Sequence, residues 1–256
     1  MTTARLILVT KFKGGSGATH VASLLAHGLG ETEPTAFADY EPQGDGAQVL
    51  GVLVEPGTGT VADFFADPAD PAASLIEIPT SPLGFYLAPH LSLTRPTGLN
   101  LCSPDRLRAA AQRAGLAWII VDSVKLPSPA TAAFVRGADL VLHVQANAVG
   151  LRTLAHADQQ LRRHAQRGQV HTVFNHLRKD ASEAALLADV AATADSRGLH
   201  PCPVRIGHDG WVAYALRNGR SPFSIGNART SHRAAADLAA WVRTELPTPP
   251  VARTAR

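Results

Sequence analysis

Residues 11–20 read KFKGGSGATH and place three glycines directly before a helical pattern. Backbone N–H groups in a glycine-rich turn that opens a helix can point at phosphate oxygens, and the helix N-terminus adds partial positive charge. Thr19 places a hydroxyl just before the helix, where it can ligate Mg²⁺. Position 18, where a lysine would contact the β- and γ-phosphates, holds alanine. Because the other donors belong to the backbone, the turn with Ala18 is still expected to bind phosphate.

Such a turn needs a strand before it and a helix after it, and the sequence predicts both. Residues 6–9 form an apolar run of strand length, and the apolar residues of THVASLLAHGL recur at helical spacing. Strand and helix patterns then alternate along the chain. Further strands are expected at residues 35–38, 84–88, 118–121, 140–144, 170–174 and 203–206, and helices at about 103–115, 128–137, 151–166, 182–197, 209–218 and 230–245.

This alternation predicts an α/β fold in one domain, residues 1–246, with a doubly wound, mostly parallel sheet and helices on both faces. The runs WIIVD and LVLHV lack alternation, as expected of buried parallel strands. A Pro/Ala/Gly-rich interval, about residues 55–74, is expected to be a surface excursion with one short helix. Residues 247–256 are rich in proline and arginine and are expected to be a disordered tail.

The order K-G-G-x-G-x-T, with a lysine before the first glycine, resembles the deviant Walker A loop of ParA/MinD-type P-loop ATPases. The resemblance implies ATP or ADP and Mg²⁺ as cofactors. In that family the early lysine, matched by Lys13, reaches across a nucleotide-sandwich homodimer to the partner's phosphates. Branches that resemble cellulose-secretion and pilus-localisation ATPases also carry Ala, Ser or Thr at the position of Ala18. The nucleotide-binding residues implied in the loop are Gly14, Gly15, Ser16, Gly17, Ala18, Thr19 and His20.

Two acidic segments extend the resemblance. FADYEPQGD is similar to a family segment in which Asp39 matches the acidic residue near Mg²⁺ and Glu41 replaces the aspartate that orients the attacking water. Asp122, at the end of WIIVD, matches the Walker B carboxylate. The resemblance thus implies Lys13, Asp39 and Glu41 as catalytic residues and Thr19, Asp39 and Asp122 as Mg²⁺ ligands. The alternative for Asp39 and Glu41 is a helix cap in an ordinary loop.

Later positions agree less closely with the family pattern. The turn after Asp122 reads SVK, and Lys125 can either supply charge to a phosphate or lie in solvent, which is the expected position. Asn175 follows a predicted strand where the family contacts adenine, although asparagine there is also a common turn former. His20 can equally be an ordinary histidine on a helix surface. The resemblance extends through the last predicted helix and covers about residues 5–246.

Charge is distributed unevenly along the chain. The net charge is +3, but residues 1–128 hold 8 Lys/Arg against 12 Asp/Glu, and residues 129–256 hold 16 against 9. In ParA-like proteins basic residues in the late region bind DNA without sequence preference, and the alternative is a solvated arginine face. The candidate DNA-binding residues are Arg205, Arg217, Arg220, Arg229 and Arg233.

Other classes of site and location find less support. The chain has two cysteines, no membrane-length apolar run and a proline-broken tail, so we expect a cytoplasmic protein without direct membrane insertion. Four late histidines match no common zinc spacing; they are His171, His176, His200 and His208.

The sequence therefore predicts an ATP-binding, ParA-like positioning or partition protein that dimerises on binding ATP and hydrolyses it slowly. Its expected partners are non-specific DNA and an adaptor protein. The alternative is a nucleotide-dependent scaffold for a membrane machine such as cellulose secretion or pilus assembly, without DNA binding. Without a lysine at residue 18, the predicted ATPase is weak or inactive.

Overall fold

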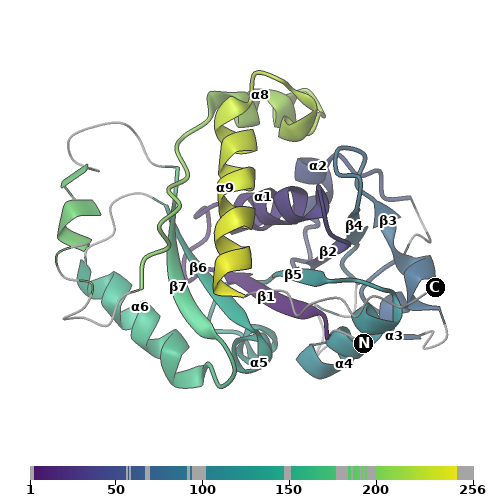
Figure 1. The fold of residues 1–256 in the computed structure, drawn as a ribbon, viewed down its shortest axis with the longest axis horizontal. Coiled ribbons are helices and arrows are strands. Elements are labelled where there is room, and N and C mark those ends of the chain that lie inside the picture. The colour runs from purple at the N-terminus through teal and green to yellow at the C-terminus, as the bar shows by residue number, and fades with distance from the viewer. Residues whose placement is uncertain are drawn as a thin grey trace.

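The protein is described from a computed structural model, which covers residues 3–55, 57, 59–66, 70–90, 93, 102–146, 151–176, 184, 185, 187–190, 192, 194 and 200–246. Its centre is a seven-stranded sheet in the order β3-β4-β2-β5-β1-β6-β7 (Figure 1). All pairings are parallel except that of β3 with β4. The strands are β1 (Arg5–Thr10), β2 (Thr35–Asp39), β3 (Ile76–Glu77), β4 (Gly84–Leu87), β5 (Trp118–Asp122), β6 (Leu140–Ala146) and β7 (Gln169–Asn175).

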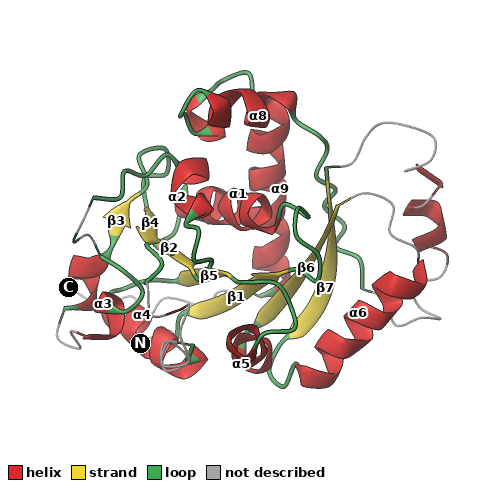
Figure 2. Cartoon of the chain, turned by 180° about the vertical axis from the view of Figure 1, so that it is seen from behind, coloured by secondary structure: helices red, strands yellow, loops and turns green. Residues whose placement is uncertain are grey.

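Helices cover both faces of the sheet, as the alternating pattern predicts (Figure 2). One face carries α1 (Ala18–Gly30), α2 (Asp45–Leu50) and α9 (Arg229–Glu245), and α8 (Gly210–Arg217) lies beyond it. The other carries α3 (Asp63–Ala66), α4 (Pro104–Arg113), α5 (Pro129–Gly137) and α6 (Leu151–His164). Two short 3-10 helices complete the described elements, η1 (Pro71–Ser74) and η4 (Pro222–Ser224).

The two faces of the sheet carry separate apolar cores. Ile7 and Val9 of β1 belong to the core beneath α1 and α9, whereas Leu6 and Leu8 belong to the core beneath α4 and α5. This split follows from the period of two along a strand. Helix α1 is buried almost all round because it lies between the sheet and α9. The central strands can therefore be apolar throughout, and their ends are fixed firmly at one edge.

The prediction of a strand at residues 203–206 is wrong. That segment runs beside β7 and shares single backbone hydrogen bonds with it, from Cys202 N–H to Thr172 O at 2.8 Å and from Ile206 N–H to Phe174 O at 3.1 Å. Prolines at 201 and 203 flank Cys202 and have no N–H, so a continuous ladder cannot form there.

The other expected elements are found, with ends shifted by a few residues, and α2 and β3 are additional. The short helix expected within residues 55–74 is α3. The expected helix at 182–197 falls largely outside the described residues. The tail at 247–256 lies entirely outside them.

Candidate functional site

The glycine turn between β1 and α1 has the backbone conformation that its sequence predicts. Gly15 and Gly17 both have φ of 77°, and Gly17 is the N-cap of α1. Val21 N–H makes an early intrahelical bond to Gly17 O at 3.0 Å, so the N–H groups before it are not used by the helix. These groups and the helix N-terminus form a site suited to an anion.

Asn175, at the end of β7, is packed against this turn. Its side-chain amide donates to Ser16 O at 3.1 Å and to Gly17 O at 3.3 Å. A Cβ on Gly17 would lie 2.2 Å from Asn175 Nδ2 and 2.8 Å from His176 Nε2. In this arrangement Asn175 shapes the loop, and its contact with adenine stays a prediction.

A pocket of about 750 Å³ opens at this edge of the sheet. Its volume falls in the range of small-molecule sites. It brings together segments that are far apart in sequence: the glycine turn, the segment after β2, the start of α2, the loop after β5 and the end of α8. Its lining includes Lys11, Gly14, Gly15, Gly17, Ala18, Thr19, Glu41, Gln43, Asp45 and Lys125.

Two predicted acidic residues lie side by side within this region. Asp39 ends β2 and Asp122 ends β5, and the two are register partners in the parallel ladder. Both are fully buried. Asp39 accepts hydrogen bonds from Tyr86 Oη at 2.8 Å and from Glu41 N–H at 2.9 Å. Burial raises the pKa of each carboxyl above its ordinary value, and the negative charge of Asp39 raises that of Asp122 further.

The state of Asp122 fits a cation. Among the described residues, neither of its carboxylate oxygens has a hydrogen-bond partner of normal geometry, although the Thr19 hydroxyl lies close enough to lower its pKa. A buried carboxylate without partners is costly unless a positive charge or a ligand satisfies it. No group of three or more His, Cys, Asp or Glu side chains is arranged as a metal site in the described part of the chain. Mg²⁺ at nucleotide sites needs only one or two carboxylates, together with phosphates and water. Thr19, Asp39 and Asp122 therefore fit Mg²⁺ bound with a nucleotide.

Lys11 is a feature of the site that the sequence analysis missed. Its ammonium forms an ion pair with Glu41, and both side chains are largely buried, at 13% and 18% exposure. Its positive charge also opposes the burial-driven rise in the pKa of Asp122. The alternation along β1 was the available signal, because odd-numbered residues from Ile7 onward face α1.

The remaining predicted residues of the loop lie in different surroundings. Lys13 is exposed, and Ser16 is buried. His20 is buried rather than on a helix surface, and its ring stacks on His176 with centroids 5.9 Å apart. Burial, followed by the nearby His176, lowers the pKa of His20 to about 4. Lys125 is exposed, as expected, at the rim of the pocket.

The five candidate DNA-binding arginines are all exposed. Arg217 ends α8, and Arg229 and Arg233 belong to the first turns of α9. Arg233 also lies 3.7 Å from Asp237, in an exposed pair that contributes little stability. Arg217, Arg229 and Arg233 thus belong to the end of α8 and the start of α9, which lie near each other (Figure 1).

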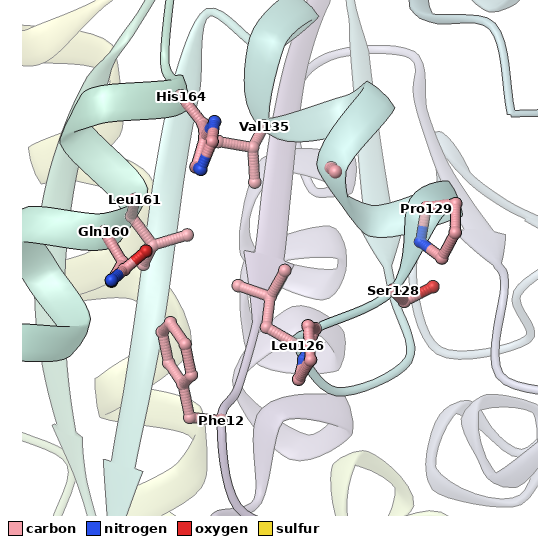
Figure 3. Close-up of a pocket in the computed structure, with 10 residues that line it drawn as sticks. Phe12, Leu126, Ser128, Pro129, Val135, Gln160, Leu161 and His164 are labelled. Carbon is pink, nitrogen blue, oxygen red and sulfur yellow. The ribbon is translucent and has the colours of Figure 1, made fainter.

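A second, apolar pocket of about 360 Å³ lies between α5, α6 and the loop after β5 (Figure 3). Phe12 points into it between α6 and the loop after β5, near Leu161 and Leu126. The Phe12 ring also makes an edge contact with His143, with centroids 5.2 Å apart. Residue 12 is therefore anchored in the core opposite to the one that residue 11 faces.

Comparison with protein-family models and with curated proteins finds no match. Comparison with solved structures finds clear matches. An ATP complex of a McdA variant from Cyanothece matches with a TM-score of 0.71 at 18% identity, over 94% of this chain and 97% of that one. A ParA family ATPase from Chlorobium tepidum matches with a TM-score of 0.69 at 17% identity, over 92% and 98%. A chain of the MinC:MinD cell division protein complex from Aquifex aeolicus matches with a TM-score of 0.75 at 16% identity, over 98% and 99%.

These likenesses extend over nearly the whole chain and over nearly the whole of each similar structure. In the described part of the chain, no helix has the length and apolar character needed to cross a membrane. The chain has the fold of the ParA/MinD-type P-loop ATPases.

Proposed function

We propose that the protein is an ATP-binding, ParA-like positioning protein that forms a nucleotide-sandwich homodimer and hydrolyses ATP slowly. The observation that carries this proposal is that the glycine turn and Glu41 line one 750 Å³ pocket, while the buried Asp39 and Asp122 are paired at the strand ends that lead into its lining. The fold alone does not imply the function, because similar folds support many activities. The placement of anion donors beside buried carboxylates is specific to phosphate and a divalent cation.

Each part of the pocket has a role in this proposal. Backbone N–H groups of the glycine turn bind the phosphates, and Thr19, Asp39 and Asp122 hold Mg²⁺. The metal ion neutralises charge on the phosphates and orients them. Glu41 orients the water that attacks the γ-phosphate, with a reach one methylene longer than that of aspartate. Lys13 is exposed and is therefore free to reach the phosphates of a second subunit.

Ala18 is the reason to expect slow hydrolysis. A lysine at that position would stabilise negative charge that develops in the transition state. Removing one such donor typically slows an enzyme by about 10²–10³-fold. Phosphate binding depends less on this side chain, since the backbone donors are retained. The protein is thus expected to bind ATP and dimerise more readily than it turns over.

Size-exclusion chromatography with light scattering tests the proposal directly. The chain should be monomeric with Mg-ADP and dimeric with Mg²⁺ and a slowly hydrolysed ATP analogue, with one nucleotide bound per subunit. Lys13→Ala should remain monomeric with the analogue while still binding it. A chain that stays monomeric and free of nucleotide at millimolar analogue would overturn the proposal.

A second candidate function is a nucleotide-dependent scaffold for a membrane machine, without DNA binding. Two features of the site favour it: the alanine at position 18 and the turn after Asp122, which reads SVK. A scaffold requires only a stable ATP-bound dimer, so loss of a transition-state charge has little consequence for it. Binding to duplex DNA separates the two candidates.

A further inference from the structure

The direction of the Lys11 side chain is fixed by the fold. Ile7 and Val9 face the core beneath α1, and the same alternation carries Lys11 to that side. Phe12 points the opposite way into the apolar pocket of Figure 3. Leu126 N–H donates to Lys11 O at 2.8 Å and ties this backbone to the loop after β5. Turning Lys11 out of the nucleotide pocket would remove Phe12 from its apolar contacts.

The surroundings of Lys11 are those of a phosphate-contacting lysine. It lines the same pocket as the glycine turn and Ala18, and its ammonium is paired with Glu41. Glu41 is also the residue expected to face the γ-phosphate. An ammonium held against Glu41 is therefore already at the phosphate end of the pocket.

We propose that Lys11 supplies, within the same subunit, the positive charge that Ala18 does not provide. Without nucleotide Lys11 pairs with Glu41, and with ATP bound it transfers to the β- and γ-phosphates. This inference rests on the proposed nucleotide function. It assigns different tasks to two neighbouring lysines. Lys11 binds the phosphates in its own subunit, and Lys13 reaches the phosphates bound in the second subunit.

The exchange keeps the Lys11 ammonium paired with an anion both without and with nucleotide. Removing one member of a largely buried ion pair is costly because the other charge is left unpaired. Here Lys11 leaves one anion for another of higher charge, and hydrogen bonds between ammonium and phosphate are strong. The same movement releases Glu41, which can then orient water only when ATP is present. Lys11 thus couples binding of the triphosphate to assembly of the hydrolytic site.

The other lysines are less suited to this task. Lys125 is exposed at the rim, on the loop after β5, and Lys13 is exposed and does not line the pocket. The chain has only one more, Lys179, which lies outside the described residues. Lys125 therefore serves as the matched comparison, because it lines the same pocket but is exposed.

Titration calorimetry of the full chain with Mg²⁺ and a slowly hydrolysed ATP analogue tests the inference. Lys11→Met should weaken binding at least tenfold, and Lys125→Met should weaken it by a clearly smaller factor. Moving the lysine back into the loop, with Lys11→Met combined with Ala18→Lys, should restore most of the affinity. Mg-ADP should be affected less than the analogue in Lys11→Met, because the γ-phosphate is missing.

The double variant Lys11→Met/Glu41→Gln distinguishes phosphate binding from a purely structural pair. If Lys11 only neutralises Glu41, removing both partners restores affinity; if Lys11 binds phosphate, the double variant stays at least tenfold weak. Thermal unfolding without nucleotide verifies that each variant is folded. The double variant also provides the test if Lys11→Met alone unfolds.

The outcomes separate this inference from the proposed function. An unaltered chain that binds neither nucleotide overturns both. If the unaltered chain binds the analogue and Lys11→Met binds it equally well, or Lys125→Met loses as much affinity, only the Lys11 inference fails. Restored affinity in Lys11→Met/Glu41→Gln also overturns it.

Discussion

At the scale of single residues, Gly17 shows how closely the phosphate turn is built against β7. Its φ of 77° is unfavourable for a side chain, and a Cβ would collide with Asn175. Gly17→Ala should therefore destabilise the fold by roughly 1–3 kcal/mol. It should also abolish analogue binding, because the turn must open to relieve the contact.

Chemical denaturation followed by circular dichroism measures the loss in Gly17→Ala. Gly14→Ala is the matched control, since none of the described atoms lies within 4 Å of a Cβ placed there. A stability for Gly17→Ala equal to that of Gly14→Ala would contradict the tight packing of the turn against Asn175.

The buried Asp122 predicts a specific dependence of stability on pH. Burial, and then the charge of Asp39, raises its pKa in the folded chain, so the folded state holds the proton more tightly than the unfolded state. The stabilisation from this proton is complete below the unfolded value of about 4 and is lost as pH rises through the raised value. Lys11 and the Thr19 hydroxyl oppose the effect, whereas Glu41 adds to it.

Asp122→Asn should therefore melt at a higher temperature than the unaltered chain without Mg²⁺ at pH 8, with a smaller difference at pH 5. Each kcal/mol gained should raise the melting temperature by roughly 2–4 °C in a chain of this size. The same variant should lose stabilisation by Mg-nucleotide. Asp105→Asn, with a side chain 92% exposed, is the control. A difference in melting temperature that is independent of pH would contradict the raised pKa.

At the scale of elements, α1 is held in place by α9, and Gly28 lies where the two helices meet. A Cβ on Gly28 would be 2.2 Å from Ala235 O and 3.1 Å from Ala239 Cβ. Because the obstacle is helix backbone, α9 must shift as a unit. Gly28→Ala should cost roughly 1–3 kcal/mol of unfolding free energy, as overpacked cores do.

Denaturant titration of Gly28→Ala tests this contact, with Gly210→Ala as the control because none of the described atoms is near a Cβ at residue 210. Unchanged stability in Gly28→Ala would show that the helices are not in close contact. Displacing α9 should also weaken nucleotide binding, since α1 carries Thr19.

Asp139 connects several elements on the other face of the sheet. It is buried and accepts hydrogen bonds from Leu6 N–H at 2.8 Å, Arg108 at 3.0 Å and Arg167 at 2.7 Å. Arg108 is itself buried. Asp139→Ala leaves its guanidinium only the exposed carboxylate of Asp105, 3.6 Å away, and should cost roughly 3–5 kcal/mol.

Asp139→Asn retains an acceptor for Leu6 N–H and should therefore lose less unfolding free energy than Asp139→Ala. Equilibrium unfolding of both variants measures the difference. Asp237→Ala is the control, since its pair with Arg233 is exposed. Equal stability of the Asp139 and Asp237 variants would contradict the buried network.

Elements could be predicted from sequence where local pattern and tertiary setting agree. The positions of the glycine turn, Asp39 and Asp122 at strand ends could be predicted because strand and turn patterns are local signals, whereas their roles were implied by the family resemblance. The expected strand at 203–206 failed because its apolar residues indicate a strand while its prolines remove the N–H groups. Lys11 was missed because its role depends on Glu41, thirty residues away and on a different strand's end. Pairings between side chains leave no periodic signal in a single sequence.

At the scale of the whole molecule, charge separates the two candidate functions. The second half of the chain holds 16 Lys/Arg against 9 Asp/Glu, and the five late arginines are exposed. A protein that neutralises DNA phosphates releases their counterions, so its affinity for DNA falls steeply as the salt concentration rises. This fall does not depend on the base sequence. A positioning protein that uses DNA as its surface should show this behaviour only as the ATP-bound dimer, because two copies double the number of contacts.

We expect the dimer with the slowly hydrolysed analogue to bind unrelated duplexes with equal affinity, and to bind them much more weakly in Mg-ADP. Fluorescence anisotropy across 50–200 mM salt measures the negative slope of log affinity against log salt, whose magnitude should fall by about 0.9 for each phosphate contact removed. Arg217→Glu/Arg220→Glu should lower both the magnitude of this slope and the affinity while the dimer persists. Arg113→Glu/Arg136→Glu, an exposed double reversal on α4 and α5, controls for net charge. If a dimer confirmed by light scattering binds no DNA at 50 mM salt, the scaffold function replaces the positioning function.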